Sequence, residues 1–90
     1  MIISNFINNN ISCVILFTDN RFEILNSKIK ELEKEVDMKN KIMIINIDNN
    51  VELTKSLFIR SVPLVYIYKN KKIIEEVFGN YSNICDIIRL

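Results

Sequence analysis

The feature of this sequence that most constrains its fold is an alternation of strand-length apolar runs with helical patterns. Residues 12–18 and 41–47 are apolar runs of the length expected for strands that are covered on both faces. A helix between two such strands predicts a parallel pair joined by a right-handed crossover. The chain therefore begins as an α/β unit.

Between the two runs, apolar residues recur at i, i+3, i+7, i+10 and i+14, which predicts a helix with one buried stripe: Phe22, Leu25, Ile29, Leu32 and Val36. Asp19 or Asn20 is expected to cap this helix. The spacing also fits a coiled coil, but it spans only about two heptads, so packing against a sheet is favoured.

A second, shorter helix is predicted after residue 50. Asn49 and Asn50 are expected to cap it, and its buried side is expected to consist of Val51, Leu53, Leu57 and Phe58.

The C-terminal third predicts a hairpin and a last helix. Residues 64–68 and 73–78 have strand character and flank the polar turn 69–72, which favours an antiparallel hairpin. Ser82 is expected to cap the final helix. We predict one α/β domain with a mixed four-stranded sheet in the order β-α-β-α-β-β-α, with helices on both faces and a short irregular or helical lead-in over residues 1–10.

Composition excludes several classes of function. The 90-residue chain has a formal net charge of +1, so nucleic acid is not expected as its main ligand. It contains no His, the usual general base and commonest zinc ligand, and no metal or cofactor is expected. Cys13 and Cys85 lie too far apart to form a local pair. The excess of Ile, Asn and Lys over Gly and Ala is typical of an AT-rich genome.

No targeting or membrane segment is predicted. The apolar runs are shorter than the ~20 residues that span a bilayer. No basic residue precedes Arg21, and residues 8–10 (Asn-Asn-Asn) interrupt the N-terminal apolar stretch, unlike a signal peptide. We expect an intracellular, cytoplasmic protein with free thiols.

Several short motifs together resemble the thioredoxin pattern in order and spacing. They are residues 46–50 (Asn-Ile-Asp-Asn-Asn), 59–63 (Ile-Arg-Ser-Val-Pro), 68–71 (Tyr-Lys-Asn-Lys) and 77–79 (Val-Phe-Gly). The resemblance covers residues 11–90. It implies a single thioredoxin-like domain over residues 1–90, whose first strand is reduced or missing.

The chemistry of that family is missing from the matching positions. Thioredoxins carry two cysteines, two residues apart, at the start of the first long helix, where one becomes a nucleophilic thiolate. Here residues 18–24 read Thr-Asp-Asn-Arg-Phe-Glu-Ile. The buried Asp–Lys pair that handles protons in thioredoxins is replaced by Leu16 and Ile44. The sequence therefore predicts a redox-inactive domain, not an enzyme.

The two cysteines leave one alternative open. Cys13 is expected to be buried in the middle of the sheet, and Cys85 half buried on the last helix, so that both are inert. The alternative is a divergent thiol oxidoreductase of the thioredoxin family that uses Cys13 or Cys85.

The resemblance also implies a binding groove. In the family, the proline that matches Pro63 follows a cis peptide bond, and the backbone before it receives an extended peptide. The candidate partner-binding residues are Asp19, Asn20, Arg21, Phe22, Arg60, Ser61, Val62, Pro63 and Gly79. Pro63 could instead be inherited architecture alone. Phe22 could line the groove, although a place in the core is favoured.

We expect a protein partner or a larger assembly. The partner would be recognised through this groove or through an exposed sheet edge. A homo-oligomer paired through an outer strand is a further alternative. The run Lys69-Asn70-Lys71-Lys72 is expected to be a solvated turn instead of a binding patch.

Overall fold

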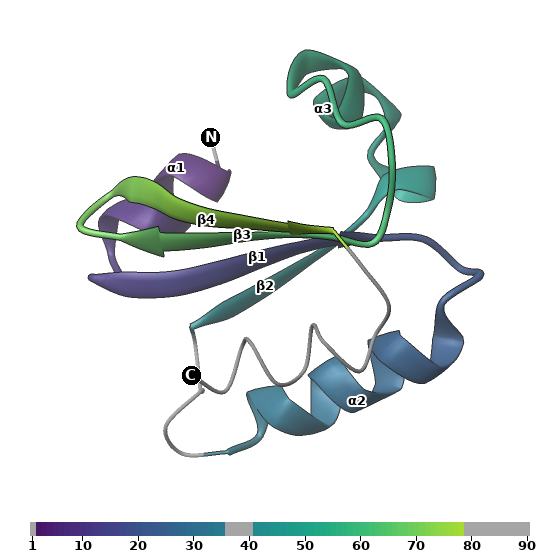
Figure 1. Cartoon of the computed structure of the whole chain (residues 1–90), viewed down its shortest axis with the longest axis horizontal. Coiled ribbons are helices and arrows are strands. Elements are labelled where there is room, and N and C mark those ends of the chain that lie inside the picture. The colour runs from purple at the N-terminus through teal and green to yellow at the C-terminus, as the bar shows by residue number, and fades with distance from the viewer. Residues whose placement is uncertain (1, 36–40, 79–90) are drawn as a thin grey trace.

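The chain folds around one mixed four-stranded sheet, which a computed structural model describes for residues 2–35 and 41–78 (Figure 1). The strand order is β2-β1-β3-β4. The elements are α1 (Ile2–Asn8), β1 (Ser12–Thr18), α2 (Glu23–Glu33), β2 (Ile42–Asn46), the 3-10 helix η2 (Ile47–Asn49), α3 (Val51–Ser56), β3 (Leu64–Lys69) and β4 (Lys72–Phe78). The predicted α/β class and mixed sheet are confirmed. The helix predicted after Ser82, with Gly79 and Val36, lies outside the described residues.

The strand β1 lies inside the sheet because both of its faces are apolar. It pairs in parallel with β2 and antiparallel with β3, as the alternation of strands and helices predicts. Six consecutive residues of β1, from Cys13 to Thr18, are buried. A strand of this kind is stable only where helices cover both faces of the sheet.

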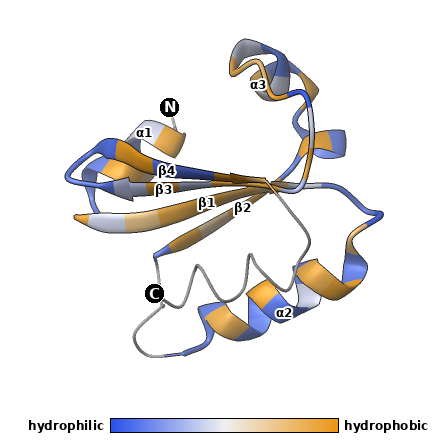
Figure 2. Cartoon of the chain, in the orientation of Figure 1, coloured by the Kyte–Doolittle hydropathy of each residue, from blue (hydrophilic) through white to orange (hydrophobic). Residues whose placement is uncertain are grey.

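Two apolar layers cover the sheet, one on each face (Figures 1 and 2). On one face, Leu25, Ile29 and Leu32 of α2 are almost fully buried and pack against Leu16 and Val65. The predicted helical stripe is therefore confirmed over its described length. On the other face, residues from α1, from α3 and from the C-cap position of α3 pack over β1 and β3: Ile3, Phe6, Ile7, Leu53 and Leu57.

The hairpin between β3 and β4 is confirmed, and its turn geometry has a local cause. Asn70 and Lys71 both have positive φ angles, 53° and 68°. Two residues in the left-handed region form the two-residue turn whose twist matches that of the flanking strands, and Asn tolerates this region better than most residues. The run that could have been a basic patch is thus an exposed turn.

Two expectations about helix ends and faces are wrong, and a third is confirmed in position only. Val51, the first residue of α3, and Phe58 are exposed, at 51% and 80%. Phe58 is exposed because α3 ends at Ser56 and the left-handed φ of Phe58 (57°) ends the helical periodicity that predicted its burial. Asn50 is the N-cap residue of α3, as predicted, but its side chain makes no capping bond and donates instead to the Asn46 carbonyl (2.8 Å). Phe22, and neither Asp19 nor Asn20, is the N-cap residue of α2.

Among the described residues, no helix has the length and apolar character needed to cross a bilayer. No group of three or more potential metal ligands occurs in the same part of the chain.

Candidate functional site

The candidate site lies at one end of the sheet, where three chain segments meet. The parallel strands β1 and β2 both end there, and Thr18 pairs with Asn46 at that end. Since Phe17 pairs with Leu64, the segment that ends at Pro63 enters the sheet at the same place. The structure thus brings the 19–22 loop and the 60–63 segment to the same end of the sheet.

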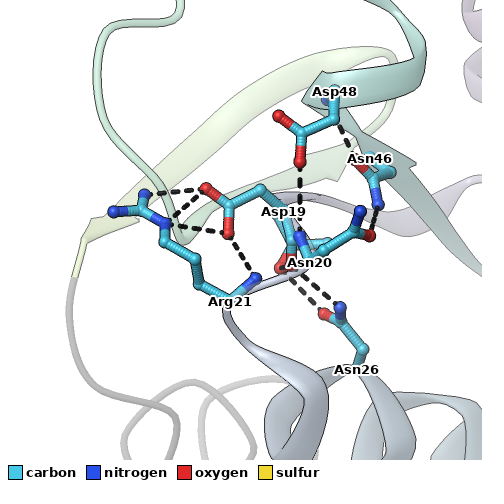
Figure 3. A network of polar contacts seen from close by, with 7 residues as sticks. Asp19, Asn20, Arg21, Asn26, Asn46 and Asp48 are labelled. Carbon is cyan, nitrogen blue, oxygen red and sulfur yellow. Dashed lines mark hydrogen bonds and ion pairs between the residues drawn. The ribbon is translucent and has the colours of Figure 1, made fainter.

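An ion pair fixes the 19–22 loop (Figure 3). The Arg21 guanidinium donates to both carboxylate oxygens of Asp19, with Nη2 at 2.7 Å and Nε at 2.9 Å from Oδ2 and Nε at 3.1 Å from Oδ1. The backbone N–H of Arg21 also donates to Oδ1 (2.9 Å). These hydrogen bonds hold the pKa of Asp19 below its usual value, so the carboxylate stays ionised. Asp19 therefore orders the loop instead of capping the helix.

Asn26 ties the loop to the first turns of α2. Its Nδ2 donates to the carbonyl of Asp19 (3.1 Å), and its Oδ1 accepts the hydroxyl of Thr18 (2.8 Å). Thr18 is almost fully buried. One amide side chain thus satisfies two polar groups where the chain leaves the sheet.

A second bridge connects the loop to the end of β2. The Asn46 Nδ2 donates to Asn20 Oδ1 (2.7 Å), and Asn46 Oδ1 accepts the backbone N–H of Asp48 (2.9 Å). The backbone N–H of Asn20 donates to Asp48 Oδ2 (3.5 Å). Figure 3 shows these side chains converging from β2 and η2 onto the loop.

The remaining predicted site residues vary in exposure. Arg60 and Ser61 are exposed, whereas Val62 and Pro63 are partly buried. The Val62–Pro63 peptide bond is cis. Gly79 lies outside the described residues. Phe22 is partly buried against the α2-side core, as favoured from the sequence, and the guanidinium carbon of Arg21 lies 5.3 Å from its ring centroid.

Known proteins resemble this chain most clearly in fold. No protein-family model matches the sequence. A thioredoxin from Rickettsia bellii is 40% identical over 42 residues, which cover 47% of this chain and 40% of that protein. The match thus spans less than half of that curated relative.

Solved structures match over nearly the whole chain. A Fasciola hepatica thioredoxin superposes with a TM-score of 0.77 at 19% identity, over 97% of this chain and 88% of that one. A mutant thioredoxin from Halobacterium salinarum gives a TM-score of 0.73 at 20% identity, over 97% and 80%. The chain has a thioredoxin-like fold. The fold prediction is therefore confirmed.

No thiol lies near the end of this thioredoxin-like sheet among the described residues. Cys13 is buried in β1 and precedes Asp19 by six residues, which is about 20 Å along an extended strand. Burial raises the pKa of the Cys13 thiol, which disfavours the thiolate. Cys85 lies outside the described residues.

The positions aligned with the proton-handling pair are neighbours in the sheet. Leu16 and Ile44 lie opposite each other in the β1–β2 register. Leu16 is fully buried, and Ile44 packs partly buried against the same apolar cluster. An ionised pair here would have to be desolvated, and an apolar pair avoids that cost.

The sequence analysis missed three residues of this site: Asn26, Asn46 and Asp48. For Asn46 and Asp48 the available signal is positional, because polar residues at the ends of two neighbouring parallel strands meet at one edge of the sheet. No such signal marks Asn26, which lies inside α2.

Proposed function

We propose that this domain is a redox-inactive, thioredoxin-like protein-binding subunit that contacts its partner with the 19–22 loop and the 60–63 segment. The single observation that carries the proposal is the Asp19–Arg21 ion pair with its Asn26 and Asn46 bridges. This network stands where the thioredoxin resemblance places the two cysteines. It orders the loop without supplying a nucleophile.

The lack of a usable thiol in the described part of the chain supports the redox half of the proposal. Exchange needs a thiolate that can reach a substrate disulfide at the protein surface. Residues 18–24 contain no cysteine. Cys13 is 2% exposed, and its pKa is raised by burial.

The geometry of Arg21 supports the binding half. Its side chain is 75% exposed, yet Asp19 fixes its position. The Nε and Nη2 groups of Arg21 donate to Asp19. Among the described contacts Nη1 is not used, so it can donate to a partner protein. A side chain that is ordered before binding loses less conformational entropy when the partner arrives.

Affinity capture tests the binding half. The tagged domain and its Arg21→Glu and Pro63→Ala variants are compared for recovery of a native partner from the source cells. Lys30→Glu is the matched charge-reversal control, because Lys30 is exposed in the last turn of α2, whereas the 19–22 loop precedes the first turn of that helix. We expect the control to retain the partner and Arg21→Glu to lose it. Retention of every partner by both Arg21→Glu and Pro63→Ala contradicts the proposed surface.

Mixed-disulfide trapping tests the alternative, a thiol oxidoreductase that uses Cys13 or Cys85. We expect no stable adduct with a disulfide substrate under native conditions. An adduct that forms rapidly in the folded protein and disappears in Cys13→Ser or Cys85→Ser favours the oxidoreductase.

A further inference from the structure

The two edges of the sheet differ in how they are protected against pairing. The outer strand β4 carries Lys72, Glu75 and Glu76. Its register with β3 shifts between Ile67 and Tyr68, which leaves Ile74 as a bulge. Charges and bulges are the devices by which natural edge strands avoid adding another strand.

The opposite edge strand, β2, has neither device. It reads Ile-Met-Ile-Ile-Asn, without a charged residue or a proline, and pairs with β1 in an unbroken parallel register. Figure 2 shows it as hydrophobic over most of its length. In the described part of the chain, no strand pairs with its outer side.

Within the described residues, the outer side of β2 presents backbone groups that no other strand pairs with. The Lys41 carbonyl accepts the Val14 N–H (2.8 Å) and so faces β1. Because successive residues of a strand turn their backbone groups to opposite sides, those of Met43 also face β1, whereas those of Ile42 and Ile44 face outward. This edge is a template for one more strand.

We propose that two copies of this chain pair through β2, antiparallel about a two-fold axis at Ile44, to form one continuous eight-stranded sheet. In this register Ile44 lies opposite the Ile44 of the second copy, and Met43 lies opposite its Ile45. Apolar residues then meet apolar residues on both faces of the sheet around the axis, and Ile42 lies opposite Asn46 at each end of the paired segment. This pairing does not depend on the proposed protein-binding surface, which is formed by the 19–22 loop and the 60–63 segment at the end of the sheet.

The second copy is favoured as the occupant because, over residues 2–35 and 41–78, only one edge of the sheet is both unpaired and unprotected. Pairing of β2 with β2 is isologous and uses up the open edge of each molecule. The two edges that remain are the bulged, charged β4 strands, so assembly stops at the dimer. The apolar residues of β2 supply cross-strand contacts on both faces, which a charged or polar segment could not match.

Charged substitutions of Ile44, the residue at the proposed two-fold axis, test the pairing. Sedimentation equilibrium from about 1 μM to about 1 mM covers the range in which weak dimers dissociate. We expect the unmodified chain to dimerise, and Ile44→Lys and Ile44→Glu each to weaken the dimer at least about fivefold, because like charges then lie opposite each other. A 1:1 mixture of the two variants should restore a heterodimer. Ile74→Lys, on the protected edge, is the matched control and should leave dimerisation unchanged.

Amide exchange of the unmodified chain provides a second test that needs no substitution. At a protein concentration ten times the dimer Kd, mass action leaves about a fifth of the protomers monomeric, so exchange at Ile44 should slow about fivefold relative to dilute protein. Amides of β4 should not respond to concentration. The proposal is overturned by a chain that stays monomeric to about 1 mM or by assemblies larger than a dimer. It is also overturned by a dimer that the Ile44 substitutions do not weaken and that does not slow exchange of the Ile44 amide.

Discussion

Leu16 and Asp19 lie three residues apart on one segment and are both buried, at 0% and 5% exposure, but their surroundings are opposite. Leu16 packs among apolar side chains from α2, β2 and β3. Asp19 is surrounded by donors from Arg21 and by the amide of Asn26. The comparison shows that this sheet keeps ionised groups out of its centre and places them at its end, where each has a partner within the described residues.

The largest expected effect comes from moving the charge into the centre. Leu16→Asp buries a carboxylate opposite Ile44 with no donor in reach, so we expect the free energy of unfolding to fall by about 4 kcal/mol. Urea denaturation measures the change. Leu16→Met keeps the volume and the apolar character, and its cost should stay below about 1.5 kcal/mol. An equal loss in both variants would mean that packing alone decides this position.

The Asp19–Arg21 pair gives a smaller, pH-dependent effect. The pKa of Asp19 is lowered in the fold, chiefly by its side-chain hydrogen bond with Arg21, so its stabilisation is complete above the ordinary value of 3.8 and is lost as the pH falls through the folded value. We expect Asp19→Asn to be less stable than the unmodified chain at pH 7. The difference should shrink as the pH falls below 3.8.

Chemical denaturation at several pH values measures this difference. A gap between Asp19→Asn and the unmodified chain that stays constant from pH 7 to the acid limit would show that the carboxylate charge is not what stabilises the loop.

Removal of the Asn26 hydrogen bonds should lower the stability of the fold by less than the Leu16→Asp substitution does. Asn26→Ala removes the short hydrogen bond of the buried Thr18 hydroxyl and one of the donors to the Asp19 carbonyl, which still accepts the N–H of Phe22 (3.2 Å), and we expect a loss of about 1 kcal/mol in the free energy of unfolding. Ser27→Ala, on the exposed face of the same helix, should change stability by less than about 0.5 kcal/mol. If the two substitutions cost the same, the bridge contributes nothing.

Phe58 belongs to neither buried region and should give the smallest effect. Its side chain is 80% exposed and its φ is 57°, a region in which a residue with a Cβ is disfavoured. Phe58→Gly relieves that strain, and the added freedom of glycine in the unfolded chain offsets part of the gain, so we expect stability to rise by about 0.5 kcal/mol. Leu57→Gly, at a partly buried neighbour, should lower the melting temperature. A clear loss in Phe58→Gly would mean that its side chain packs.

The sequence was sufficient for the fold because the sheet centre is determined by simple patterns. Each of three patterns is compatible with only one stable packing of the chain. They are the apolar runs that form β1 and β2, the stripe of Leu25, Ile29 and Leu32, and the polar hairpin turn. The buried side of α3 was predicted only in part: Leu53 and Leu57 pack on the core, whereas Phe58 does not, because the helix ends at Ser56 and the chain then turns left-handed at Phe58.

The candidate site was predictable only as a location. The resemblance identified the 19–22 loop and Pro63, and the missing cysteines were visible at once. The bonds from Asn26 and Asn46 depend on how the ends of β1, β2 and α2 approach one another. In a chain rich in Asn, no local spacing marks these two residues among the others.

The central claim is that the ordered 19–22 loop binds without thiol chemistry, and insulin disulfide reduction by dithiothreitol tests it most directly. Turbidity is followed with this protein and, in parallel, with an active thioredoxin that carries both cysteines. We predict that this protein gives the uncatalysed rate at every concentration, whereas the thioredoxin accelerates precipitation. A concentration-dependent acceleration that is abolished in Cys13→Ser or Cys85→Ser would contradict the account.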